Sequence, residues 1–155
     1  MAMNYEIRPA RPEDVRPALA LALHACMEYE TDPAATEEFR AACMDETRIH
    51  EHIEGTRDMF VAMEGVRVTG MIAAHRKRGR GHVNMLFVEP AHHRQGIATA
   101  LMDALLRHLD EPRVTVYASD HGMPFYLRYG FVPTDARQQK NGLTFTPMAL
   151  DRTQR

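Results

Sequence analysis

Residues 88–99 read VEPAHHRQGIAT, and this stretch joins an apolar run to an amphipathic one. The run Val83–Val88 has the composition of a buried strand, and Pro90 ends it. Beyond the turn, apolar side chains recur at helical spacing, at Ile97, Leu101, Leu105 and Leu109. The sequence therefore predicts a strand that leads into a helix through a short basic turn.

The turn itself has the features of an anion site. The first turn of a helix carries unpaired backbone N–H groups and the positive end of the peptide dipoles, which suits a phosphate. Gly96 lets the backbone approach a ligand closely, and Arg94 adds a permanent positive charge. Neither the three-glycine dinucleotide fingerprint nor a Walker loop is present. On geometry alone there is an alternative, because a strand–turn–helix unit of this kind can also bind nothing.

Length and charge restrict the class of protein. A chain of 155 residues has no room for two full domains, so residues 1–155 are predicted to form a single domain. A formal net charge of -2 lacks the basic footprint of a nucleic-acid-binding protein. No apolar run approaches the roughly 18–20 residues of a membrane span, and Met1–Glu6 lacks a secretory signal. We therefore expect a cytoplasmic protein without nucleic-acid or membrane partners.

The periodicity of the rest of the chain predicts an α/β domain. Alternating or β-branched runs indicate about seven strands, at residues 5–8, 59–63, 66–75, 82–88 and 113–118, from 131, and at 143–150. Helical periodicity indicates about four helices, at residues 12–29, 34–54, 97–109 and 123–129. The order predicts a mixed, mostly antiparallel sheet in which strands 82–88 and 113–118 form a parallel pair with a right-handed crossover. Residues 77–81 are expected to form a polar loop, and Asn141-Gly142 a hairpin turn.

A second recognisable segment follows the strand at residues 113–118. Residues 118–131 read ASDHGMPFYLRYGF, in which an aromatic pair precedes Gly130 and Phe131. In isolation, such a pair on a short helix indicates a hydrophobic core. Together with the frame HRQGIA at residues 93–98, however, it resembles the two motifs of the GNAT superfamily of acyl-CoA-dependent N-acyltransferases, in the same order and on the same elements. The resemblance covers residues 60–150, with His93 where the family usually has Gln or Arg.

The resemblance implies a GNAT-like fold with acetyl-CoA as co-substrate and no metal. In this family two parallel strands splay apart at their carboxyl ends, and the pantetheine arm of the cofactor completes the ladder in the gap. The pyrophosphate then lies on the turn after the first of these strands. The cofactor-binding residues that the resemblance implies are Leu86, Phe87, Val88, His93, Arg94, Gln95, Gly96, Ile97, Ala98, Thr99, Ser119 and Tyr126.

The resemblance also implies direct attack of a primary amine, from a small molecule or a peptide, on the thioester in a ternary complex. Tyr126 is then the general acid for the departing sulfur, and the Leu86 N–H stabilises the oxyanion. As the base we expect His82, with Asn84 as a water-holding partner and Glu89 as the runner-up. Because side chains alternate along a strand, we expect one face to lead toward the thioester and to carry four side chains, those of His82, Asn84, Leu86 and Val88. The alternatives are a core tyrosine and a solvated histidine at a strand end.

The sequence defines the acceptor less closely. Residues 28–58 are rich in acidic side chains, which form either a rim for a cationic amine or a solvated helical face. Basic side chains gather before the strand at residues 82–88 and in the turn after it, where they either meet the 3′-phosphate of CoA or remain loop charges; they are Arg76, Lys77, Arg78, Arg80 and Arg94.

Other functions and assemblies stay open at this point. The same fold can bind acetyl-CoA as a catalytically silent sensor or regulatory module, and the family permits a homodimer. A partner-binding surface is the third hypothesis, against an ordinary core role for its methionines, Met27, Met44, Met59 and Met63. Cys26 and Cys43 are expected to be free buried thiols rather than a disulfide or zinc ligands.

Overall fold

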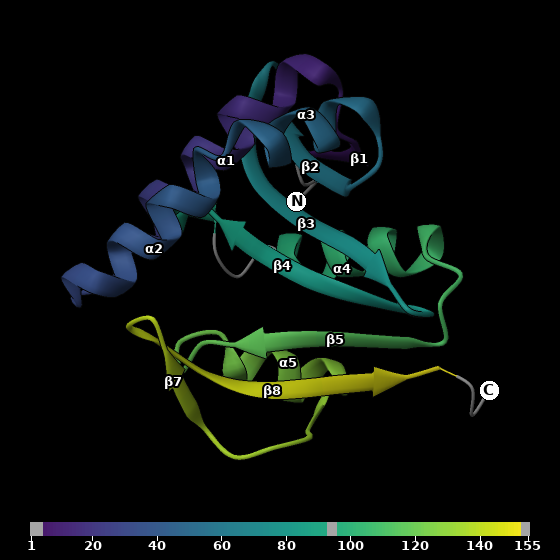
Figure 1. Cartoon of the computed structure of the whole chain (residues 1–155). Coiled ribbons are helices and arrows are strands. Elements are labelled where there is room, and N and C mark those ends of the chain that lie inside the picture. The colour runs from purple at the N-terminus through teal and green to yellow at the C-terminus, as the bar shows by residue number, and fades with distance from the viewer. Residues whose placement is uncertain (1–4, 93–95, 153–155) are drawn as a thin grey trace.

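The computed structural model describes residues 5–92 and 96–152, which form an open sheet between two groups of helices (Figure 1). The helices are α1 (Pro12–Met27), α2 (Pro33–Cys43), α3 (Glu46–Glu54), α4 (Ile97–His108) and α5 (Met123–Tyr129). The strands are β1 (Glu6–Pro9), β2 (Asp58–Glu64), β3 (Arg67–Lys77), β4 (Arg80–Val88), β5 (Arg113–Ala118), β6 (Val132–Pro133), β7 (Gln138–Lys140) and β8 (Leu143–Asp151). A 3₁₀ turn, Pro90–His92, follows β4.

The strands are hydrogen-bonded in the order β1-β2-β3-β4-β5-β8-β6, and β7 pairs with β8. Every neighbouring pair on this path is antiparallel except β4 and β5, which are parallel. The connection between β4 and β5 runs through α4, because parallel neighbours need a crossover. The expected mixed, mostly antiparallel sheet with one parallel pair is therefore confirmed.

The helices cover both faces of the sheet and bury two apolar clusters (Figure 1). α4 and α5 cover one face, where Leu101 and Leu105 of the predicted helical stripe are fully buried. α1, α2 and α3 contribute to the cluster on the other face, with Val15 and Ile49 among its buried residues. These are called the α4 face and the α1 face below. The sheet thus has a covered core on each side of β4.

The predicted helix at residues 34–54 is two helices, which brings the described total to five rather than about four. The break falls before α3, where Asp45 has an extended backbone and its carboxylate accepts the N–H of Arg48 at 3.1 Å. A side chain that caps a new helix in this way competes with continuation of the preceding one. Asp32 caps α2 in the same way, because its side chain accepts the N–H groups of Ala34 and Ala35.

The described sheet has eight strands rather than about seven. The additional strand is β7, whose polar side chains carry no alternating pattern and which forms by pairing with β8. The predicted loop at residues 77–81 is a tight turn, because β3 extends to Lys77 and β4 begins at Arg80. The predicted hairpin turn is confirmed, since Asn141 and Gly142 have the positive φ angles, 54° and 81°, that a two-residue turn of this kind needs.

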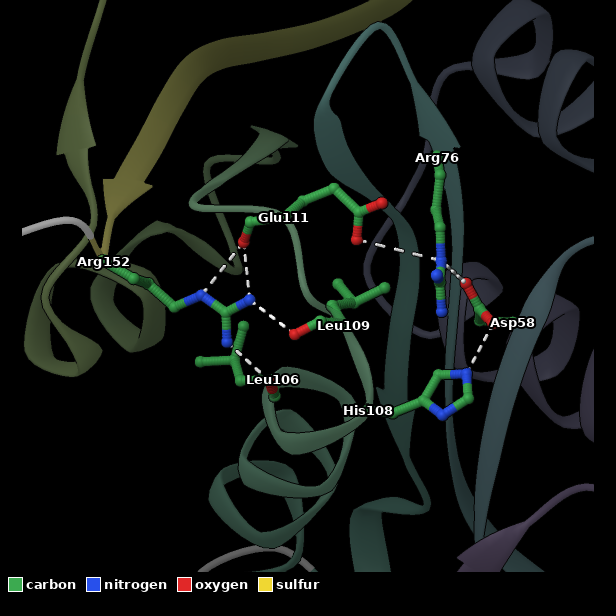
Figure 2. Close-up of polar contacts among 7 residues, drawn as sticks. All are labelled: Asp58, Arg76, Leu106, His108, Leu109, Glu111 and Arg152. Carbon is green, nitrogen blue, oxygen red and sulfur yellow. Dashed lines mark hydrogen bonds and ion pairs between the residues drawn. The ribbon is translucent and has the colours of Figure 1, made fainter.

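Arg152, which directly follows β8, closes the carboxyl end of α4 (Figure 2). Its guanidinium donates to the carbonyl oxygens of Leu106 at 2.5 Å, Leu109 at 2.7 Å and Glu111 at 2.5 Å. The last carbonyl groups of a helix have no partner within it, so the side chain satisfies acceptors that would otherwise need water. This contact fixes the end of α4 beside the start of β5.

A second polar group ties the same corner to β2 and β3 (Figure 2). The carboxylate of Asp58 is 2.9 Å from Nε2 of His108 and 3.1 Å from Nε of Arg76. The same Arg76 nitrogen is 3.9 Å from Oε1 of Glu111. The closed end of the β4–β5 pair is therefore held by contacts from four different elements and loops.

Candidate active site

The parallel strands β4 and β5 separate partway along their length (Figure 1). Their pairing ends at Val83 and Val116, although β4 continues to Val88 and β5 to Ala118. Residues 84–88 therefore have no partner in β5. Backbone N–H and C=O groups on such an open edge can bind an extended ligand as an added strand.

A β-bulge at Asn84 changes the direction of the side chains along β4. Ala73 of β3 lies opposite Met85 and Ala74 lies opposite Val83, which leaves Asn84 as the extra residue. An extra residue reverses the alternation beyond it and increases the local twist. The bulge lies where the two parallel strands begin to separate.

Because of this bulge, the prediction that His82, Asn84, Leu86 and Val88 share one face of β4 is wrong. Leu86 and Val88 pack in the α4-face cluster together with Val83, whereas Phe87 packs on the α1 face. His82 precedes Val83 and therefore points to the α1 face, opposite to Leu86 and Val88. Alternation counted from the sequence assumes an unbroken pleat, and the bulge breaks it.

A cleft of about 1110 Å³ passes between the separated strands. Leu86 and Tyr126 line it from the α4 face, and His82 and Phe87 line it from the α1 face. Helix α1 contributes residues at its carboxyl end, and α4 contributes its amino end. Because the cleft reaches both faces, two molecules can enter from opposite sides and meet between the strands.

The cleft brings together nearly all of the site residues expected from the sequence. Those that line it are His82, Asn84, Leu86, Phe87, Val88, Gly96, Ile97, Ala98, Thr99, Ser119 and Tyr126. His93, Arg94 and Gln95 lie outside the described residues. Glu89 does not line the cleft.

The amino end of α4 opens onto the cleft. Gly96 precedes the helix in the left-handed conformation, with φ 77° and ψ 11°. A Cβ there would meet no atom within 4 Å, so the backbone angle rather than space calls for glycine. The N–H groups of residues 97–99 belong to the first helical turn, which has no earlier carbonyl partners within the helix. The cleft therefore has a group of backbone donors at one end.

Tyr126 of α5 is the most deeply placed polar side chain of the predicted site. It is 7% exposed and packs edge-on against Phe125 and Phe131, each ring centroid 5.4 Å away. Burial raises the pKa of Tyr126 far above its usual range, and the nearby Tyr29 adds to the rise. The phenol therefore keeps its proton at neutral pH and can act as a donor.

Ser119 and two residues that the sequence did not single out meet across the cleft. Oγ of Ser119 accepts the N–H of Gly122 at 3.0 Å. Tyr29, just after α1, stacks on His121 with ring centroids 4.1 Å apart and an interplanar angle of 15°. Burial raises the pKa of Tyr29 to about 12, while its hydrogen bond with Ser119 acts in the opposite direction. The contact connects the α1–α2 loop to the loop after β5.

His82 is held by β5 rather than left in solvent. Its Nδ1 is 2.7 Å from Oγ1 of Thr115, which in turn donates to the carbonyl oxygen of Gly81 at 3.4 Å. This contact engages Nδ1 of His82 and fixes the orientation of the ring beside β5. Burial lowers the pKa of His82 to about 4, and the nearby His75 and Arg80 contribute. The ring is therefore neutral at pH 7.

The other candidate base and the expected water-holding amide have partners of their own. Oδ1 of Asn84 is 2.9 Å from Nδ1 of His75, across the β3–β4 pair. Glu89 accepts from Nη1 of Arg67 at 2.6 Å and lies 3.2 Å from Nδ1 of His92. A carboxylate so paired outside the cleft has an ordinary structural role.

Only part of the acidic region at residues 28–58 lines the cleft. Glu28, Glu30 and Glu38 line the cleft. Other acids of this region are paired elsewhere, as Glu46 is with Arg16 at 3.0 Å. The cleft thus has acidic side chains on its α1–α2 side.

Sequence reasoning missed several lining residues, and the aromatic ones among them include Tyr29, Tyr117, His121 and Phe145. Of these four, only His121 carried a local signal, because it lies in the segment between the strand end and the motif tyrosine. The other three come from elements whose neighbours are set by tertiary packing. No sequence motif marks them.

Several further expectations can be compared with the described residues. Met59 and Met63 are buried, 6% and 5% exposed, so the four methionines do not form one surface and that hypothesis is wrong. Cys26 and Cys43 are buried and unbridged. In residues 5–92 and 96–152 no helix is long and apolar enough to cross a membrane. The same ranges hold no group of three or more His, Cys, Asp or Glu side chains arranged for a metal.

The chain is similar in sequence to known acetyltransferases. The family model of the acetyltransferase (GNAT) domain matches residues 24–152. A curated protein of Escherichia coli (strain K12), described as the uncharacterized N-acetyltransferase YafP, is 31% identical over 129 residues. The alignment covers 83% of this chain and 81% of that protein.

Solved structures share the fold along almost the whole chain. The PaiA N-acetyltransferase from Thermoplasma acidophilum, in complex with coenzyme A, has a TM-score of 0.74 at 15% identity and covers 96% of this chain and 99% of its own. A GCN5-related N-acetyltransferase from Rhodopseudomonas palustris has a TM-score of 0.74 at 24% identity, covering 97% and 98%. With a separated parallel pair, a helix start at its mouth and a family match over most of its length, the chain belongs to the GNAT acetyltransferase family.

Proposed function

We propose that this protein transfers an acetyl group from acetyl-CoA to a primary amine, by direct attack in a ternary complex in the cytoplasm. The observation that carries the proposal is a single cleft that reaches both faces of the sheet and contains a buried, protonated tyrosine. Two substrates can meet there without a covalent enzyme intermediate. The fold relative from Thermoplasma acidophilum was solved with coenzyme A, which supports the choice of cofactor.

The open edge of β4 and the start of α4 are the proposed cofactor site. Backbone groups of Leu86, Phe87 and Val88 would hydrogen-bond the pantetheine arm as a short added strand. The N–H groups at residues 96–99, with the expected contributions of residues 93–95, would hold the pyrophosphate. Ser119 would complete the pantetheine contacts, and Tyr29, its present hydrogen-bond partner, would have to share or release it.

Three chemical events need support in the transfer. The amine nitrogen bonds to the carbonyl carbon, the carbonyl oxygen becomes negative, and the carbon–sulfur bond breaks as the oxyanion collapses. The Leu86 N–H is our proposed donor to the oxyanion, a role commonly worth a hundredfold or more, on the order of 10²–10³ in rate. Tyr126 would donate a proton or a hydrogen bond to the departing thiolate and so stabilise its negative charge as the carbon–sulfur bond breaks.

The attacking amine must also lose a proton, and we propose that His82 accepts it through Nε2. The Thr115 contact at 2.7 Å engages Nδ1 and orients the ring, and the proposed role requires the tautomer with its proton on Nδ1. A pKa of about 4 means that this ring takes a proton only transiently, from a nitrogen that is becoming positive as it attacks. Asn84 would hold a water in the relay while its own oxygen stays with His75.

The acceptor is proposed to be a small molecule or a peptide with a free amine. The direct test measures thiol release from acetyl-CoA against amino acids, polyamines, aminoglycosides and peptides with free amino termini. Amine-dependent thiol release, with one acetyl group found on the amine by mass spectrometry, is the expected result.

A sensor of the same fold would give a different outcome. Acetyl-CoA would then bind and raise the melting temperature in a saturable way, without thiol release on any amine of the panel. That result would reject catalysis while keeping the cofactor site. Absence of both effects would reject the cofactor site as well.

A further inference from the structure

A second hollow, of about 420 Å³, adjoins the cleft over β5 and β8. It shares Tyr117, Lys140 and Phe145 with the cleft, so the two spaces are continuous there. Thr115 and Tyr117 of its lining point to the α1 face, because they alternate with buried Val114 and Val116 of the α4-face cluster. The space is called the β5–β8 hollow below.

Aromatic rings form the part of the hollow nearest the cleft. Tyr117 is 59% exposed, and its ring centroid is 4.7 Å from that of Phe145 and 4.6 Å from that of His82. A large exposed aromatic side chain beside a hollow offers apolar area to a bound molecule. The rings therefore suit an apolar or aromatic body that extends away from the base His82.

Three cations line the hollow, Arg80, Arg113 and Lys140, against one carboxylate, Asp135, so positive charge is in excess. Arg113 is paired with Asp151 at 2.8 Å, and Asp135 accepts the side-chain amide of Gln138 at 3.1 Å. Arg80 and Lys140 also line the hollow. Among residues 5–92 and 96–152 neither of these two cations has an ion pair or side-chain hydrogen bond. An anion is the complementary ligand group.

The spacing along β4 gives the distance between the backbone of Arg80 and the point where the strands separate. Arg80 lies three residues before Val83, where the strands separate. At about 3.3 Å per residue this places Arg80 roughly 10 Å from the mouth of the splay. An extended tripeptide spans about the same length between its terminal groups.

We propose that the β5–β8 hollow is the acceptor subsite, and that it selects primary amines bearing a carboxylate roughly 10 Å from the nitrogen across an apolar or aromatic spacer. The inference rests on the proposed acetyl transfer and specifies its substrate class. Tyr117 and Phe145 contact the spacer, and Arg80 binds the carboxylate. Lys140 lies at the border with the cleft and adds to the attraction.

The test compares a glycyl-phenylalanyl-glycine tripeptide with its carboxyl-terminal amide, which differs by the negative charge alone. Calorimetric binding to the full chain, with and without coenzyme A, is expected to favour the acid by about ten- to hundredfold, as for a hydrogen bond to a charged group. Arg80→Ala should abolish the preference. Arg107→Ala, which removes an exposed cation from α4 on the other face of the sheet, should leave it unchanged.

Steady-state kinetics of acetyl transfer provide a second, independent test. Arg80→Ala should raise KM for the acid about tenfold or more relative to KM for the amide, because the contact with the carboxylate exists equally before and during reaction. The preference should also weaken as salt is added, since Arg80 is exposed. An Arg80-dependent preference in binding without any acetylation would uphold the subsite and reject the proposed activity.

Three results would overturn the inference. Equal binding of acid and amide by the unchanged protein would remove the carboxylate from recognition. A preference for spermidine over both peptides would point to the acidic side of the cleft instead. A stable dimer in sedimentation that Tyr117→Glu dissociates would show that a second copy covers the hollow. In each of these cases acetyl transfer to another amine remains measurable by thiol release.

Discussion

The environment of Tyr126 matters more to the proposed chemistry than its position in a motif. Two aromatic neighbours hold the ring, and burial keeps the phenol protonated. A buried donor of this kind is useful where negative charge forms beside it, and the thiolate released in acetyl transfer carries such a charge. The same burial is also what an ordinary core tyrosine would have. A substitution that removes only the hydroxyl therefore separates the two roles.

Tyr126→Phe is expected to lower kcat by about a hundredfold or more, the usual contribution of a general acid, with little change in acetyl-CoA affinity. Tyr129→Phe on the same helix is the matched control, because its hydroxyl bonds Asp103 at 2.5 Å outside the cleft. That control should keep kcat within about twofold and lose roughly 1–2 kcal/mol of stability. Steady-state kinetics and calorimetry measure both. Equal rates for Tyr126→Phe and the unchanged protein would exclude the acid role.

His82 allows a different kind of test at the same scale. Because its pKa is lowered to about 4, the ring is already neutral throughout pH 6–9. His82→Gln should therefore lower kcat/KM by a constant factor over this range, without moving a limb near pH 6.5. A limb near pH 6.5 that disappears in His121→Gln would transfer the base role to His121. The measurement is the pH profile of kcat/KM.

At the scale of elements, the bulge in β4 and the Arg152 cap on α4 set the shape of the opening between β4 and β5. The bulge at Asn84 starts the separation of the strands, and the contacts around Arg152 hold the opposite end closed. The amino end of the same helix faces the proposed pyrophosphate. A displacement of the carboxyl end of α4 would therefore also displace its amino end, because a helix behaves as a rigid rod over this length.

Arg152→Ala should lower stability by about 1–3 kcal/mol, because it leaves helix-end carbonyl groups without a protein donor. For a domain of this size the melting temperature would fall by roughly 2–4 °C per kcal/mol. Lys77→Ala removes an exposed cation at the end of β3 and serves as the control, with a change of about 0.5 kcal/mol or less. Denaturant unfolding measures both variants. A loss no larger than that of Lys77→Ala would show that water replaces the cap fully.

The molecule as a whole places its two proposed substrates on opposite faces of one sheet. Most of the proposed cofactor-binding groups lie on the α4 side, Phe87 being an exception, and the proposed acceptor groups lie on the α1 side. Two imidazole rings, those of His52 and His82, are partly buried in the molecule. Burial lowers the pKa of both His52 and His82 to about 4.

The protein should therefore lose stability in mild acid. In the unfolded chain these two rings bind protons below about pH 6.5, whereas in the folded chain they do so only near pH 4. Stability falls wherever the unfolded state holds more protons, which is between these values. We expect a melting temperature roughly 5–10 °C lower at pH 5 than at pH 7.5.

The double variant His52→Gln, His82→Gln supplies the control for the acid effect. It should show a much flatter profile from pH 7.5 to pH 5 in the same thermal melts. A slope equal to that of the unchanged protein would assign the acid sensitivity to other groups.

The features that the sequence by itself determined are local ones. The helical stripe after Gly96, the proline that follows β4 and the Asn141-Gly142 turn depend on neighbours within a few residues, so periodicity and turn chemistry were sufficient. Tertiary structure decided what depends on distant partners. The bulge at Asn84 follows from pairing with β3, the stack of Tyr29 on His121 joins segments far apart in the chain, and the β5–β8 hollow exists only between packed strands. Pairing and packing energies are shared between remote residues, and a single stretch of sequence does not contain them.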